Sequence, residues 1–220
     1  SLGRFIVGDG ADLPMADELA SLIAADPAHE LAAARAELLR AMRNGFVLEG
    51  RSDLEHRWKQ ASVLASAHSH GVPLTVHPGI GYDIISNHPM FNGAAIGRAA
   101  QIDFQTFAGT LEQLNGGVVL SIGSAIMGPQ VFEKALSCVN HIRLKEGRGI
   151  VKNHSMYVVD LQDGGNWDWT QGEPPITSSA YYLRFCKTYA RMGGSMYYLQ
   201  CDNLAFVQHL SRALGVSNPS

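Results

Sequence analysis

The stretch GGVVLSIGSAIMGPQVFEKAL, residues 116–136, decides the fold class that this sequence predicts. Its largely apolar run, Val118–Ile122, is typical of a strand buried on both faces of a parallel sheet. A turn of small residues follows at 123–128, and Pro129 suits the first turn of the next helix. Strand, glycine turn and helix in this order indicate part of a βαβ unit.

The same alternation of strands and helices continues on both sides of this stretch. Further strands are expected at 72–76, 155–161 and 195–200. Helices are expected at 15–26, 28–45, 52–71, 92–117, 128–141, 181–194 and 202–214, the third of them starting at a capping box of Ser52 and Glu55. The pattern predicts a three-layer α/β fold, in which helices cover both faces of a parallel sheet.

Length and composition favour one α/β domain over residues 1–220. The chain is 46% hydrophobic and 17% charged, with a net charge of -3 and no basic stripe, so we expect no nucleic-acid partner. No apolar run approaches the roughly 20 residues of a membrane span, so no membrane partner is expected. Three widely separated cysteines favour a reducing, cytoplasmic location. The abrupt start SLGRFIV suggests that an N-terminal portion lies outside this sequence.

The region 147–179 is expected to be a long loop, and its segment DGGNWDWTQGEPP, residues 163–175, is rich in Gly, Pro, Asp and Trp. Loops of this length in a compact domain are usually functional or mobile. Trp167 and Trp169 either stack on a ligand ring or close a lid, or they anchor the loop to its own body or to another subunit.

Two of the predicted strands end in glycine-rich turns, HPGIGYD at 77–83 and GSAIMG at 123–128. Such turns let backbone N–H groups and a helix N-terminus approach a phosphate, although the same glycines can serve tight turns alone. Asp83 could accept hydrogen bonds from ribose hydroxyls or cap the following helix. A third reading is a metal-dependent hydrolase that uses His77, Asp83 and His88, although no H-E-x-x-H motif is present.

Read together, the two turns and the segment between them, Val72 to Leu136, resemble the deoxyhypusine synthase superfamily, and most closely its bacterial deoxyhypusine synthase-like branch. The resemblance implies a Rossmann-like fold that binds NAD and forms a homo-oligomer, a dimer or a tetramer. The matching cofactor residues are Gly79, Gly81, Asp83, Gly123, Ser124 and Ala125. His77, Asp83 and His88 are the candidates for catalysis.

Two departures from the family pattern bear on the chemistry. The family's imine-forming lysine stands in a Trp–Gly–Lys context, whereas NWDWTQGEPP contains no lysine. The histidine expected after the second glycine turn is also missing from GSAIMGPQ. We therefore expect a dinucleotide-binding protein with an unassigned reaction, not a true deoxyhypusine synthase. A non-catalytic structural or regulatory oligomer of the same fold is the alternative.

Overall fold

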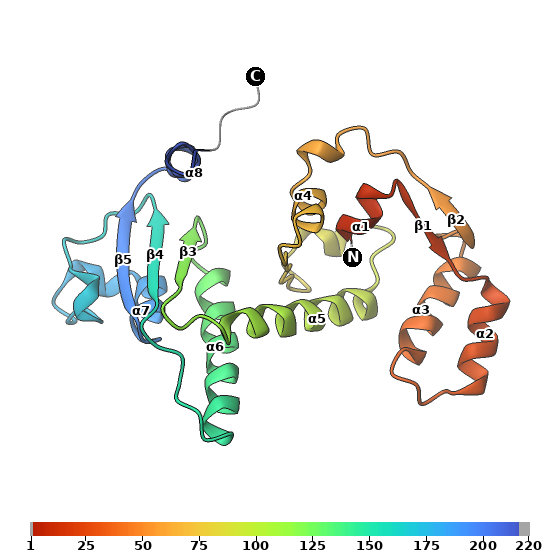
Figure 1. The fold of residues 1–220 in the computed structure, drawn as a ribbon, viewed down its shortest axis with the longest axis horizontal. Coiled ribbons are helices and arrows are strands. Elements are labelled where there is room, and N and C mark those ends of the chain that lie inside the picture. Colours follow the sequence, from red (N-terminus) through yellow and green to blue (C-terminus); the bar gives the residue numbers. More distant parts are fainter. Residues whose placement is uncertain (1, 216–220) are drawn as a thin grey trace. The chain divides into compact units, whose positions relative to one another are not determined.

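The computed structural model describes residues 2–215 and divides into two compact units, Ser1–Phe104 and Gln105–Ser220, each of which is described by itself. Helix α5, Gly93–Leu111, runs across the boundary between them (Figure 1). The parallel sheet expected of the α/β domain lies wholly in the second unit. Among the described helices, none is both long and apolar enough to cross a membrane.

The first unit combines short helices with a two-stranded antiparallel ribbon. Its elements are α1 Leu2–Val7, β1 Gly10–Leu13, α2 Ala16–Ala25, α3 Ala32–Arg43, β2 Gly50–Asp53, α4 Val63–Ser69 and two 3₁₀ helices, Lys59–Ala61 and Ile84–Asn87. Strand β1 pairs with β2, and few hydrophobic side chains of this unit are buried. Helices α2 and α3 confirm the two helices that the Ala- and Leu-rich pattern predicts at 15–26 and 28–45.

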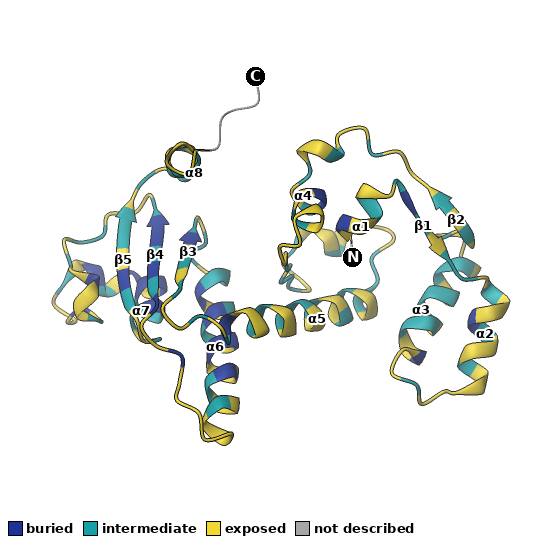
Figure 2. Ribbon diagram, viewed as in Figure 1, coloured by how far each residue is buried: buried dark blue, intermediate teal, exposed yellow. Residues whose placement is uncertain are grey.

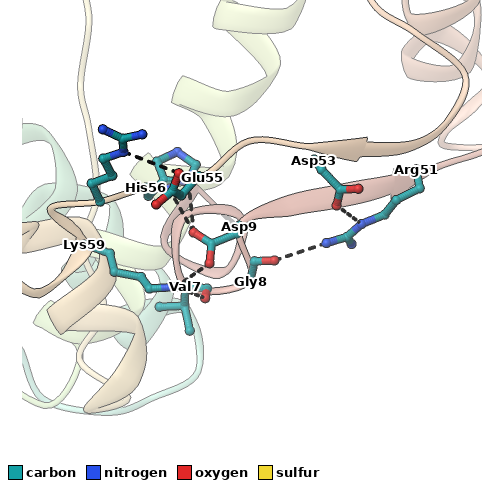
Figure 3. A network of polar contacts seen from close by, with 9 residues as sticks. Val7, Gly8, Asp9, Arg51, Asp53, Glu55, His56 and Lys59 are labelled. Carbon is teal, nitrogen blue, oxygen red and sulfur yellow. Dashed lines mark hydrogen bonds and ion pairs between the residues drawn. The ribbon is translucent and has the colours of Figure 1, made fainter.

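Asp9 joins the turn after α1 to a segment almost fifty residues away in sequence (Figure 3). Its backbone has a φ of 48°, a conformation that non-glycine residues rarely adopt. The carboxylate accepts hydrogen bonds from the backbone N–H of His56 at 2.9 Å and from Nζ of Lys59 at 2.5 Å. The bond from Lys59 is the main cause that lowers the pKa of Asp9. The ordering of this turn therefore depends on a charged contact.

Two sequence-based expectations for the first unit are wrong. Ser52 lies in β2 opposite Ala11, and the helix expected from 52 begins only at Val63, where the Ser62 side chain accepts from the N–H of Ala65 at 3.3 Å. Residues 72–76 form no strand. An apolar run becomes a strand only where a neighbour takes its backbone hydrogen bonds. No strand of the described residues pairs with this run.

The second unit contains a three-stranded parallel sheet in the order β3-β4-β5. Its elements are β3 Val118–Ile122, α6 Met127–Lys145, β4 Ser155–Asp160, α7 Arg184–Ala190, β5 Ser195–Gln200, α8 Asn203–Ala213 and the 3₁₀ helices Trp169–Gln171 and Ser179–Tyr182. The predicted strands at 118–122, 155–161 and 195–200 are confirmed. The fold is thus mixed α/β with a small parallel sheet.

Most of the core of the second unit lies on one face of this sheet. Figure 2 shows its buried residues gathered on β4 and on the helices beside it. Met156 and Met196 are opposed across β4 and β5, and both are buried together with Phe132 of α6 and Tyr189 of α7. The rings of Phe132 and Tyr189 lie 5.4 Å apart. Helices α6 and α7 therefore cover this face.

The other face of the sheet is apolar but only partly covered. Val118, Leu120 and Tyr197 alternate with the buried residues along their strands and are 60%, 43% and 39% exposed. The rings of Tyr157 and Tyr197 stack across β4 and β5 at 4.9 Å. These side chains form a contiguous apolar patch and are not isolated exposed hydrophobic residues, and such patches are typical of interaction surfaces.

The loop expected at 147–179 contains β4, and its Trp-rich part packs on β5. Trp169 is only 3% exposed, and Nε1 of Trp167 donates to the carbonyl oxygen of Gly172 at 2.9 Å. β5 pairs with β4 on one side only, so its other edge needs protection from unwanted pairing. Of the alternatives for the two tryptophans, the structure favours anchoring of the loop to its own body.

Candidate functional site at the carboxyl edge of the parallel sheet

The two predicted glycine turns lie in different units, so each is a separate candidate. Gly79, Gly81 and Asp83 belong to the first unit, whereas Gly123, Ser124 and Ala125 belong to the second. Only the second turn follows a strand. Because ligands of open α/β sheets bind beyond the carboxyl ends of strands, the second turn is the better supported site.

The first turn is closed by its own hydrogen bonds. The N–H of Gly79 donates to the Asp83 carboxylate, and the N–H of Asp83 donates back to the carbonyl oxygen of Gly79 at 3.1 Å. The Tyr82 ring occupies the space that a Cβ at Gly79 would need, and Gly81 has a φ of +103°. Asp83 then precedes the 3₁₀ helix Ile84–Asn87 without capping it through its side chain. Its carboxylate thus serves the turn itself.

His77 and His88 flank this turn and contact their own neighbours. Nε2 of His77 lies 3.0 Å from Oγ1 of Thr75, and Nδ1 of His88 accepts from the N–H of Met90 at 3.1 Å. Within residues 2–215, no three or more His, Cys, Asp or Glu side chains are grouped so that they could hold a metal ion. His77, Asp83 and His88 are therefore not assembled as a ligand set.

The second turn leads directly from β3 into α6. Gly123 has a φ of +67°, and its N–H donates to the carbonyl oxygen of Val159 at 3.2 Å, which ties the turn to β4. Oγ of Ser124 accepts from the N–H of Gly128 at 2.8 Å and so satisfies one donor of the first helical turn. Within the described chain, the N–H groups of Ala125 and Ile126 have no acceptor.

Buried groups beneath the turn hold it in place. Tyr189 of α7 and Ser121 of β3 are both buried. Burial is the main cause that raises the pKa of Tyr189, so its hydroxyl stays neutral near pH 7. A Cβ at Gly128 would lie 2.8 Å from Oγ of Ser124 and 3.2 Å from the Tyr189 hydroxyl oxygen. The start of α6 is therefore packed too closely for a larger residue.

Two polar residues at this edge escaped the sequence-based search, Asn203 and Asp160. The amide of Asn203, at the start of α8, fills the space beside Gly123, and its Oδ1 is buried without a hydrogen-bond partner among the described residues. A buried polar atom left unpaired costs roughly 1–3 kcal/mol, so such an atom calls for an explanation. A ligand that donates a hydrogen bond at this edge would supply one.

Asp160 is the last residue of β4, the strand next to β3. Its Oδ1 accepts from the N–H of Gln162 at 3.0 Å. Burial is the main cause that raises the pKa of the Cys186 thiol, and the charge of Asp160 adds to it. Burial first, and then the charge of Asp160, raise the pKa of Tyr198 to about 12. The strand-end rule could have found Asp160, because the strand SMYVVD was predicted. No local signal could have found the contact of Asn203.

A cavity of about 330 Å³ lies between the Trp-rich loop and β5. Trp167, Trp169 and Tyr198 contribute aromatic walls, and Asp163 and Gln200 contribute polar groups near the ends of β4 and β5. Nε1 of Trp169 is buried and has no partner among the described residues. The cavity is of a size that could take one planar ring.

Comparisons of the chain with protein-family models, curated proteins and solved structures find no match.

Proposed function

We propose that the second unit binds a dinucleotide, NAD before NADP or FAD, across the carboxyl edge of its parallel sheet. The observation that carries this proposal is the unpaired, buried Oδ1 of Asn203 beside the Gly123 turn, at the point where β3 passes into α6. Strand, glycine turn, helix and adjacent strand are the parts of a mononucleotide-binding half of a Rossmann-like fold.

The pyrophosphate would lie at the N-terminus of α6. The helix has 19 residues and carries no acidic residue in its first turn, so its dipole favours an anion there. The N–H groups of Ala125 and Ile126 are available donors, and Gly123 keeps the backbone free of a Cβ on the side of Asn203. Ser124 holds this conformation through its bond to Gly128.

The ribose next to the pyrophosphate would be held by Asp160 and Asn203. A carboxylate at the end of the second strand of such a unit accepts hydrogen bonds from ribose hydroxyls, and Asp160 occupies that place beside the turn. Oδ1 of Asn203 would accept a hydrogen bond from a further ribose hydroxyl, which would offset the cost of burying this oxygen without a partner. A negative charge at Asp160 would repel a 2′-phosphate, which favours NAD over NADP.

The proposal keeps the resemblance to deoxyhypusine synthase-like proteins, with a Rossmann-like three-layer arrangement and an unassigned reaction. The family's lysine has no counterpart in the Trp-rich loop, so the aminobutyl transfer of a true deoxyhypusine synthase is not proposed. Gly79, Gly81 and Asp83 stay cofactor candidates through the resemblance alone, because the Asp83 carboxylate already closes its own turn.

Isothermal titration of the full chain with NAD, NADP and FAD tests the proposal. We expect NAD to bind, and we expect Asp160→Asn to weaken binding about 10- to 100-fold, since a hydrogen bond to a charged group contributes about 1.5–3 kcal/mol. Asp17→Asn, an exposed carboxylate on α2, is the matched control and should bind NAD as the parent does. The proposal fails if no dinucleotide binds at millimolar concentration.

The second candidate function is a non-catalytic homo-oligomer, and the exposed apolar sheet face with Val118, Leu120 and Tyr197 favours it. A second copy that covered this face would remove the apolar surface from water. Light scattering after gel filtration would give the mass, and Leu120→Glu would lower it if the face is an interface. Dinucleotide binding that persists in monomeric Leu120→Glu would favour the first function.

A further inference from the structure

An apolar cavity of about 810 Å³ lies within the first unit, between α3 and the N-terminal half of α5. Its walls are mostly small and apolar side chains of the two helices and of the segments 46–47 and 90–92. Phe46, Phe91 and Ile102 are among its larger apolar residues. A cavity of this size and lining falls within the range of small-molecule sites in proteins.

Two arginines line this cavity, Arg40 and Arg98, and only the charge of Arg40 is neutralised by a carboxylate of the described residues. Arg40 pairs with Glu37 at 2.7 Å, and Glu37 also accepts from Nδ2 of Asn92 at 2.6 Å. The bond from Arg40 and then that from Asn92 lower the pKa of Glu37. These groups therefore neutralise and satisfy one another.

Arg98, on α5, is half-buried and has no ion pair within residues 2–215. Its Nη1 donates to the carbonyl oxygen of Glu30 at 3.4 Å, which fixes the side chain but leaves its charge uncompensated. The cavity thus combines apolar walls with one cation that lacks a counter-ion. Its chemical complement is an apolar chain that carries one anionic group.

We propose that this cavity binds an aliphatic carboxylate, with the hydrocarbon chain between α3 and α5 and the carboxylate on the guanidinium of Arg98. The planar guanidinium can bind both carboxylate oxygens at once, which favours a carboxylate over a neutral or cationic head group. The alanine-rich walls leave room for the chain, whose burial removes apolar surface from water. This site is independent of the dinucleotide proposed for the second unit.

The test is a titration of the full chain with dodecanoate, kept below its micelle concentration, beside dodecanol and dodecyltrimethylammonium. We expect dodecanoate to bind at least tenfold more tightly than either analogue. Shortening the chain to decanoate should weaken binding, by at most about fourfold per methylene removed. Equal binding of the carboxylate and the ammonium compound would overturn the role of Arg98.

Two variants and a control separate the head group from the chain. Arg98→Gln should weaken dodecanoate at least tenfold and leave dodecanol unchanged, whereas Arg43→Gln, an exposed arginine at the end of α3 outside the cavity, should change neither. Ala95→Phe, which places a ring in the cavity from an exposed position, should abolish binding of both compounds. Circular dichroism confirms that each variant is folded.

Binding that is unaffected by Ala95→Phe would overturn the proposal, because it would place the ligand elsewhere. A ligand-free dimer that Ala95→Phe converts to a monomer would also overturn it, since a second copy of the chain would then occupy the cavity.

Discussion

Gly123→Ala provides the sharpest test of the turn between β3 and α6. Gly123 has a φ of +67°, and a Cβ there would overlap the side-chain amide of Asn203. Gly147, after the end of α6, has a φ of +73°, but no atom lies within 4 Å of its would-be Cβ. Alanine at both positions is strained in the same way by the backbone. Only Gly123→Ala adds a steric clash.

The expected magnitudes follow from this difference. A left-handed backbone costs a non-glycine residue about 1–2 kcal/mol, so Gly147→Ala should reduce the free energy of unfolding by about that amount. Overpacking adds about 1–3 kcal/mol in a closely packed site, so Gly123→Ala should cost about 2–5 kcal/mol in total. Movement of Asn203 to relieve the overlap would also disturb its unpaired Oδ1.

Urea unfolding followed by circular dichroism measures both variants, with unchanged m-values as the sign that the unfolding reaction is the same. Titration with NAD follows for each variant that is folded at 25 °C. We expect Gly147→Ala to keep NAD affinity and Gly123→Ala to lose it. Equal destabilisation of the two variants would refute the close approach of Gly123 and Asn203 on which the site is built.

Three further predictions concern the second unit. His154 is 1% exposed, both its ring nitrogens lack partners among the described residues, and burial lowers its pKa below the usual value of histidine, about 6.5. The unfolded state therefore binds the proton more readily, so the stability that His154 contributes is full above about pH 6.5 and falls as the pH drops from there toward the folded pKa. His154→Phe should flatten this part of the unfolding free energy measured between pH 7.5 and 5, and an unchanged slope would contradict the assignment. Trp169→Ala should lower the free energy of unfolding in urea by about 3–5 kcal/mol because the ring is 3% exposed, whereas Trp167→Ala should lower it less because Trp167 is half-buried. Equal losses of stability in the two variants would argue against anchoring by Trp169. Ser124→Ala removes the acceptor of the Gly128 N–H and should lower the free energy of unfolding by about 1 kcal/mol. An unchanged free energy of unfolding would contradict this role of Ser124.

The strands of the second unit could be predicted because their signals are local. The run Val118–Ile122 is apolar apart from Ser121 and lies between glycines, and β3 has the same bounds. The run 72–76 carries a similar signal, yet it forms no strand, because no neighbour pairs with it and the N–H of Val76 donates to Asp103 instead. Strand formation depends on a partner, and a single sequence does not show the partner.

The helix starts show the same limit. Ser52 and Glu55 have the spacing of a capping box, but pairing of Ser52 with Ala11 in the antiparallel ribbon takes precedence over the local signal. The side chain of Ser62 caps the start of α4, although no Glu or Gln stands three residues later to complete a capping box. Asp202, by contrast, caps α8 as its position before the last helix predicts, through the N–H of Ala205 at 3.0 Å.

Half of the candidate site was accessible from sequence. The glycine turn after β3 is a local feature, so Gly123, Ser124 and Ala125 could be named in advance. Asp160 required the recognition that the end of β4 lies beside that turn, which follows from the parallel order of β3 and β4. Asn203 could not be found, since its approach to Gly123 joins residues eighty positions apart.

Hydrogen–deuterium exchange of the full chain, with and without saturating NAD, tests the central claim most directly. The account predicts slower exchange with NAD at residues 123–128, where the Gly123 turn enters α6, and at residues 160–163 after β4. Unchanged exchange in both segments, or protection confined to residues 79–83, would contradict a dinucleotide site at the carboxyl edge of the parallel sheet.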